Sequence, residues 1–371
     1  MRLHCLIVVS TLVWSGFVPF GHAPLGHAES LETIRQQFEI YHRLPGEIGI
    51  LATGDAEKID NVLQRTDTKR LAARKALDKA QSAGKQAATK TQQDALSPLF
   101  TEGYAAPFLH YVAVERAFAK RSLQQGKPDE VMQSIQYVYR LTDELSEAGV
   151  LELRSTSALV RLQMLEVVQA LLLNPHCRRE HHQSLHDLFE EQAGSDKTIW
   201  ERYREEGKQF FEKTATRGFD KTVSPNLLKE LLDRRALEHY KKKTTERLSQ
   251  DQSVFLQAMS AVIEASEMSF YRRQTFLQQL NKELKEHQGT ATEPVFTLLL
   301  LREVGESMRL FAQERTGNEM AYLALSASLH GLPRRKIMNF LTGNEYEFPL
   351  IPGGIMCTYE GNIKPFYVPH R

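Results

Sequence analysis

Residues 125–149 read QGKPDEVMQSIQYVYRLTDELSEAG, and this stretch decides the fold class. Its aliphatic side chains recur at intervals of four, three, three and four residues, which places them on one stripe of an α-helix. They are Val131, Ile135, Val138, Leu141 and Leu145. Asp129 and Glu130 precede the stripe and suit the positive end of a helix. Because residues 105–124 carry another stripe before the turn at Gly126, the stretch predicts two helices joined as an αα-hairpin.

The segment that follows the hairpin is apolar on nearly every side. Its large apolar side chains cover most of a helix circumference and are Leu159, Val160, Leu162, Met164, Leu165, Val167, Val168, Leu171 and Leu172. A helix of this kind must be buried on several sides. We therefore place the helix over residues 150–173 at the centre of the fold.

Further periodic segments extend the helical pattern along the chain. They cover residues 29–44, 56–95, 178–192, 197–214, 225–248, 253–287, 295–315 and 319–329. Beyond Gly331, proline, glycine and aromatic residues alternate, which is typical of turns and a short hairpin. The sequence thus predicts an all-α protein of packed, repeat-like helical hairpins with an irregular or β-hairpin tail. The expected divisions are a signal peptide at 1–28, partly exposed basic helices at 29–97, a helical core domain at 98–330 and a tail packed on the core at 331–371.

The N-terminus has the layout of a secretory signal peptide. Arg2 and His4 give a basic start, Leu6 to Val18 form an apolar run, and two small-residue sites end at Ala23 and Ala28. The run is shorter than the roughly 20 residues that span a bilayer. We expect a periplasmic or secreted protein that is cleaved near one of the two alanines, with an uncleaved anchor as the alternative. No later stretch is expected to cross a membrane.

Composition argues against some partners and offers no catalytic signature. A net charge of +1 over 371 residues gives no overall field for nucleic acid, so nucleic-acid binding is not expected. The basic residues of 56–95, such as Arg70 and Arg74, suggest either a polyanion-binding arm or a solvated helix, and the second is favoured. The chain lacks the G-x-S-x-G, Walker and G-x-G-x-x-G motifs, so we predict no catalytic residue and no cofactor.

A histidine-rich stretch is the best candidate for metal binding. His182, His186 and Glu190 are spaced four apart and share a helix face, and imidazole with carboxylate suits zinc. Cys177 and His181 fall on the core-facing stripe, so the cluster is divided between two faces. We therefore expect a solvated polar face and no structural metal site.

Charged residues on the central apolar helix need an explanation. Arg154, Arg161 and Glu166 either line a ligand groove or pair with acids such as Glu115 or Glu144 on neighbouring helices. Pairing is the favoured interpretation.

The cysteine content allows one disulfide bond in the mature chain. Removal of the signal peptide leaves Cys177 and Cys357, and an oxidising compartment permits a disulfide between them. Two inert thiols are the alternative.

Two resemblances add to these patterns. Residues 125–131 resemble the inter-helix turn of tetratricopeptide-type repeats, because glycine, lysine and proline are followed by acidic residues and an aliphatic one. Roughly residues 105–370 are similar to uncharacterised exported α-helical proteins of planctomycete-type bacteria. The likeness includes a helix rich in Glu and Arg at 200–207 and aromatic motifs at 359–362 and 366–367. This family implies export and a helical fold but no activity.

The leading hypothesis is an exported helical scaffold or protein-interaction module with partners in the cell envelope, because packed hairpins build concave surfaces. A periplasmic metal- or small-ligand-binding protein is the alternative, and an envelope hydrolase is the second alternative.

Overall fold

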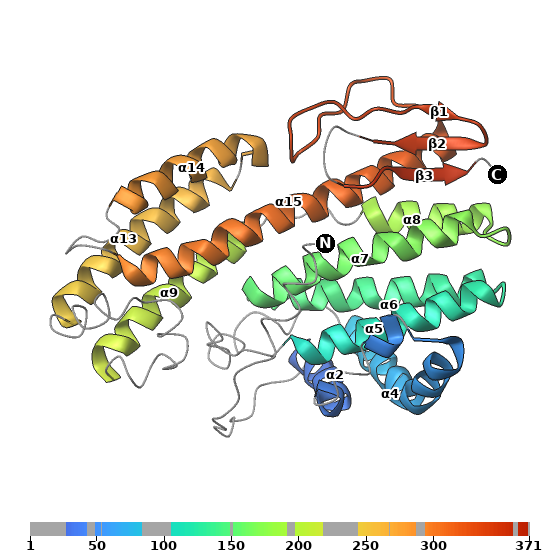
Figure 1. Cartoon of the computed structure of the whole chain (residues 1–371), viewed down its shortest axis with the longest axis horizontal. Helices are drawn as coiled ribbons and strands as arrows, with labels where there is room; N and C mark the ends of the chain where they lie inside the picture. Colours follow the sequence, from blue (N-terminus) through green and yellow to red (C-terminus); the bar gives the residue numbers. More distant parts are fainter. Residues whose placement is uncertain are drawn as a thin grey trace.

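The chain folds as predicted into helices with a small C-terminal sheet (Figure 1). The computed structural model describes residues 27–42, 49–52, 54–83, 105–148, 151–190, 197–217, 244–266, 268–286, 294–358 and 363–369. The helices in these ranges are α2 (His27–His42), α4 (Ala56–Ala83), α5 (Ala106–Gln124), α6 (Pro128–Glu147), α7 (Leu151–Leu173), α8 (Arg179–Glu190), α9 (Lys197–Arg217), α13 (Thr244–Ala265), α14 (Phe270–Glu286) and α15 (Val295–His330). The strands are β1 (Leu350–Ile351), β2 (Gly354–Cys357) and β3 (Phe366–Pro369).

Helices α5 and α6 form the predicted hairpin. Each has a proline at its first or second position, where an N–H would have no intrahelical partner. Gly126 adopts a φ of 71° in the turn, and its N–H donates to the carbonyl of Leu123 at 3.1 Å. Asp129 and Glu130 lie in the first turn of α6. The hairpin therefore follows from local signals in its own sequence.

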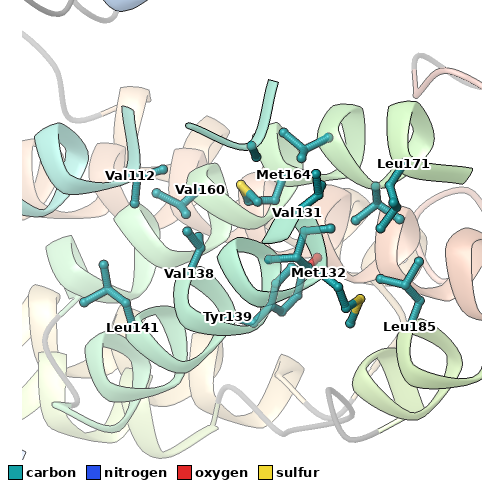
Figure 2. Packing of buried hydrophobic residues seen from close by; sticks show 14 of the residues in the cluster. Val112, Val131, Met132, Val138, Tyr139, Leu141, Val160, Met164, Leu171 and Leu185 are labelled. Carbon is teal, nitrogen blue, oxygen red and sulfur yellow. The ribbon is translucent and has the colours of Figure 1, made fainter. Parts of the chain in front are cut away.

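Helix α7 lies at the centre of a first hydrophobic cluster, as its all-round apolar surface predicts. It packs against α5, α6, α15 and β3. Figure 2 shows Val160 of α7 beside Val138 of α6 and Met164 of α7 beside Val131 of α6. Contrary to expectation, α7 is long and apolar enough to cross a membrane by length and composition alone, but 61% of its most apolar window is buried inside the protein. Burial in a core produces the same composition.

Helix α15 is one helix of 36 residues where the sequence predicts two. The predicted break contains Gly317, which faces α7: a Cβ at this position would lie 2.7 Å from Cδ1 of Leu165. Glu314 and Asn318 on either side are 3% and 5% exposed. The prediction of a break is wrong because these polar residues belong to a buried helix–helix contact.

The long helix joins two hydrophobic clusters. Its first half packs with α9 and α13 in a second cluster, which includes Trp200, Phe255 and Phe296, whereas its second half belongs to the first cluster. Figure 1 shows α15 passing from α9, α13 and α14 to α8 and the strands. Asp251 of α13 caps the beginning of α15, because its carboxylate accepts hydrogen bonds from the N–H groups of Phe296 and Thr297 at 2.9 and 3.0 Å. The described residues of 98–330 thus contribute to both clusters, and α15 connects them.

Other predicted boundaries change as well. Residues 253–287 form α13 and α14 instead of one helix, and the N–H of Phe270 at the corner donates to the carbonyl of Phe340 at 3.1 Å. Most of the helix predicted over 225–248 lies outside the described residues. The N-terminal helices are well packed, since α2 and α4 both contribute to the first cluster.

The tail forms an antiparallel sheet with strand order β1-β2-β3. Cys357 pairs with Phe366 and Ile355 with Val368 across β2 and β3. Gln169 of α7 extends the sheet: it accepts the N–H of Tyr367 at 2.9 Å and donates to the carbonyl of Tyr367 at 2.7 Å. The tail is therefore packed on the core, as predicted, and is more ordered than a single hairpin.

Candidate functional site

The predicted groove residues of α7 separate into a buried pair and an exposed acid. Arg154 and Arg161 are 8% and 5% exposed, and both donate to Glu314 of α15, at 2.8 and 3.0 Å. Glu166 lies at the surface, 3.5 Å from Arg116 and 3.8 Å from Lys364. The three residues therefore do not line one groove.

Both arginines pair with acids of neighbouring helices, which is the favoured interpretation from the sequence. Arg161 contacts Asp143 at 2.5 Å in addition to Glu314. These two acids take the role expected for Glu115 or Glu144. The connection between Arg161 and Glu314 spans 153 residues of sequence, so no local pattern could reveal it.

The Glu314 carboxylate is ionised inside the protein. Burial opposes ionisation, but the guanidinium groups of Arg154 and Arg161 outweigh burial and hold the pKa of Glu314 below its ordinary value. Arg154 also lies 4.3 Å from the ring centroid of Phe311, and Asn318 donates to Glu314 at 3.0 Å. This network holds α7 to α15 where the two hydrophobic clusters meet.

A second buried network, which the sequence did not predict, joins α4 to α5 and α6. Glu115 is fully buried and accepts two hydrogen bonds from Arg74, at 2.8 and 2.6 Å. Arg70 lies 3.9 Å from the same carboxylate and 3.8 Å above the ring of Phe118. Arg74 also donates to Ser134 at 2.9 Å. For these two arginines, both the polyanion-binding and the solvated interpretations are wrong.

The histidines of α8 are buried instead of solvated. His182 and His186 are 2% and 6% exposed, because α15 packs against α8. The ring of His186 lies 4.7 Å from that of Tyr322 and 5.6 Å from that of His330. Glu190 remains exposed. The expected solvated face is therefore wrong for both histidines, and replacing them would alter the core.

Near His186 the structure assembles a group of possible metal ligands that differs from the predicted one. The ligand atoms of His186, Asp187 and Glu190 lie within 4.8 Å of one another. Asp187 replaces His182 in this group. The signal that could have shown this is the three-residue spacing between Asp187 and Glu190, which places both acids on one edge of the helix.

His181 and Cys177 lie on the core side, as expected. Nδ1 of His181 accepts the N–H of Arg178 at 2.8 Å, so its Nε2 carries the proton donated to Asp129, also at 2.8 Å. This hydrogen bond lowers the pKa of Asp129, with Arg178 adding to the effect. His181 thus connects the beginning of α8 to α6.

Cys177 and Cys357 are not joined by a disulfide in the structure. Both are buried. Burial raises the pKa of the Cys357 thiol to about 12, which leaves almost no reactive thiolate at neutral pH.

The side chain of Glu206 on α9 is 11% exposed. Burial raises the pKa of Glu206 to about 7, although Arg202 lies 3.4 Å away and opposes the rise. Arg202 also donates to the carbonyl of Ala148 at 2.5 Å. Arg202 and Glu206 therefore lie at the junction between α9 and the end of α6.

Exposed apolar side chains lie on two segments that meet at the corner between α13 and α14. Met268 and Tyr271 are 48% and 38% exposed, and Met338 in the segment after α15 is 59% exposed. The hydrogen bond between Phe270 and Phe340 brings these two segments together, and Tyr271 lies against Gly343. We call Met268, Tyr271 and Met338 the corner surface. Exposed basic residues flank it and are Arg272, Arg334, Arg335 and Lys336.

Comparisons of the chain with protein-family models, with curated proteins and with solved structures give no match. The resemblances to tetratricopeptide-type turns and to exported planctomycete-type proteins stay predictions.

Proposed function

We propose that the protein is an exported helical scaffold that binds a protein partner of the cell envelope through the corner surface. The observation that carries the proposal is that three large apolar side chains are exposed on the two segments joined by the hydrogen bond between Phe270 and Phe340. Methionine, tyrosine and arginine are residue types enriched in protein interfaces.

The corner surface is held in a fixed conformation. Ile337 accepts the N–H of Tyr346 at 2.9 Å, and the N–H of Asn339 donates to Asn344 at 2.7 Å. Asn339 is 1% exposed. Met338 lies between these anchored residues and is therefore held outward. A preformed surface loses little conformational entropy on binding, which favours affinity.

Charge defines the partner. Arg272, Arg334 and Arg335 form no ion pair with an acid in the part of the chain that the structure describes, and Lys336 pairs with Glu345 at 2.7 Å. A surface with exposed apolar side chains and flanking arginines complements a partner with apolar and acidic groups. We therefore expect binding that weakens as the salt concentration rises.

Export is supported by the relation of the cleavage sites to α2. Residues 1–26 lie outside the described ranges. The buried residues described in α2 are Leu31, Ile34 and Phe38. A cut after Ala23 leaves α2 whole, and a cut after Ala28 removes its first two residues but none of these buried ones. Both predicted cuts are thus compatible with the fold.

We expect the mature protein to begin at Pro24 or Glu29. N-terminal sequencing of protein purified from the envelope or the medium tests this. A chain from these fractions that still begins at Met1 would contradict cleavage, and recovery of the protein only from the cytoplasm would contradict export.

Binding is tested with an affinity-tagged chain purified from its native envelope. With the triple variant Arg334→Glu, Arg335→Glu, Met338→Ser, the amount of acidic partner protein that co-purifies should fall at least about tenfold. The reason is that truncation of a central interface residue costs about 2 kcal/mol or more of binding free energy. Leu71→Ser on α4 is the control, since Leu71 is 45% exposed on another helix. Equal recovery by the two variants would contradict the proposed surface.

A further inference from the structure

The ends of α8 and α15 bring four ligand-type side chains together, away from the corner surface. His186, Asp187 and Glu190 come from the last two turns of α8, and His330 is the last residue of α15. The ligand atoms of the first three lie within 4.8 Å of one another, and the rings of His186 and His330 are 5.6 Å apart. We propose that these four residues bind one divalent transition-metal ion of the zinc class.

Helix geometry explains why the three residues of α8 converge. His186 and Glu190 are four apart and lie one above the other on the same face. Asp187 is three residues before Glu190 and therefore lies next to it. The turn that carries these residues ends at Glu190, where the chain leaves the helix.

Of the three ligands on α8, one is held in place and two can move. His186 is 6% exposed and lies 4.7 Å from the ring of Tyr322, which fixes its ring. Asp187 and Glu190 are exposed, so their carboxylates can close around an ion without rearranging the core. Zinc requires nitrogen and oxygen ligands at about 2.0 to 2.2 Å. The two exposed carboxylates and the exposed ring of His330 are the ligands that adjust to these distances.

The local electrostatics favour a cation. Helix C-termini carry partial negative charge, and α8 and α15 both end at this group. Asp187 and Glu190 add two carboxylates. Asp187 accepts a hydrogen bond from Gln183 at 2.7 Å and lies 3.3 Å from Nδ1 of His186, and neither acid is paired with a lysine or arginine among the described residues. Negative side chains at the negative end of a helix are unfavourable without a counterion. A divalent ion would compensate both effects.

The donor set decides the class of ion. Imidazole suits zinc, copper, nickel and iron, whereas magnesium and calcium take oxygen ligands almost entirely. His186 and His330 therefore favour a transition metal over magnesium or calcium. Because the fold already has two hydrophobic clusters, the ion would be a bound ligand and not a requirement for folding.

Calorimetric titration of the metal-stripped mature protein with zinc chloride tests the proposal. We expect one zinc ion per chain. The double variant Asp187→Asn, Glu190→Gln should weaken zinc binding by at least about tenfold. Both substitutions are at exposed positions, so the variant should keep the circular dichroism spectrum of the parent.

A matched control and a fourth-ligand variant make the test specific. Glu180→Gln removes an exposed carboxylate from the first turn of the same helix and should leave zinc affinity within twofold of the parent. His330→Ala should weaken binding at least threefold, and unchanged affinity would overturn the four-ligand site. Absence of zinc binding by the parent, or equal binding by the Asp187→Asn, Glu190→Gln variant, would overturn the proposal as a whole.

Discussion

Replacing Glu314 with alanine should lower the free energy of unfolding by about 3 to 5 kcal/mol. The substitution leaves Arg154 and Arg161 buried without the carboxylate that both contact, and breaking a buried ion pair by removing one partner has a cost of this size. Urea denaturation of purified parent and variant measures the difference.

Glu166→Gln is the matched control, because it removes an exposed acid from α7, the helix that carries Arg154 and Arg161. Glu166 is an exposed acid of α7 whose contacts with Arg116 and Lys364 are at the surface, so its loss should cost less than about 1 kcal/mol. A cost below about 1 kcal/mol for Glu314→Ala would show that the buried network does not hold α7 to α15.

The effect of Glu314→Ala should also depend on pH. The pKa of Glu314 in the folded protein lies below its ordinary value of 4.5. Its contribution to stability is therefore present above the unfolded pKa and is lost as the pH falls through the folded pKa. The difference between parent and variant should shrink in acid.

Glu115→Ala should have an effect of similar size, about 3 to 5 kcal/mol, for a related reason. Glu115 is fully buried, and the substitution removes the two hydrogen bonds from Arg74 and the contact with Arg70. Because these arginines belong to α4, the substitution should increase the hydrogen-exchange rates of the α4 amides more than those of the α7 amides. Chemical denaturation and hydrogen exchange measure the two parts of this prediction.

The control for the second network is Asp67→Asn. Asp67 contacts Arg70 at 2.6 Å on the same helix, and its side chain is 49% exposed, so the change should cost less than about 1 kcal/mol. If Glu115→Ala and Asp67→Asn destabilise equally, or if α4 and α7 gain equal exchange rates, the assigned role of Glu115 is incorrect.

Local patterns predicted the parts of the fold that depend on neighbouring residues. The hairpin of α5 and α6 follows from the Gly126 turn and the stripe from Val131 to Leu145, and these signals lie within one segment. The central position of α7 follows from its apolar circumference. In both cases the side chains that determine the structure are adjacent in the sequence.

Contacts between distant segments explain the errors. The residues around Gly317 resemble a loop because Glu314 and Asn318 are polar, yet their partners lie on α7 and within α15. Arg70 and Arg74 lie on the buried side of α4, and their common spacing with buried Val62 and Leu77 was the available signal. A polar side chain on an apolar stripe indicates a buried partner, but not which partner.

The candidate sites also depend on contacts between segments that are distant in the sequence. His186 and Glu190 were candidates from their spacing, whereas Asp187 entered the group only through its position beside Glu190. His330 and Tyr322 come from α15 and could not be assigned to α8 without the structure. The corner surface likewise joins Met268 and Met338, which are 70 residues apart in the sequence.

Site-specific photo-crosslinking tests the proposed interaction surface most directly. A photoreactive amino acid is placed at Met338 in the full chain, and an otherwise identical chain carries it at Leu71, which is also exposed. After illumination of intact cells, the Met338 chain should form a covalent adduct with one acidic envelope protein, and the Leu71 chain should not. Adducts of equal amount and composition from both positions, or none from Met338, would contradict the account.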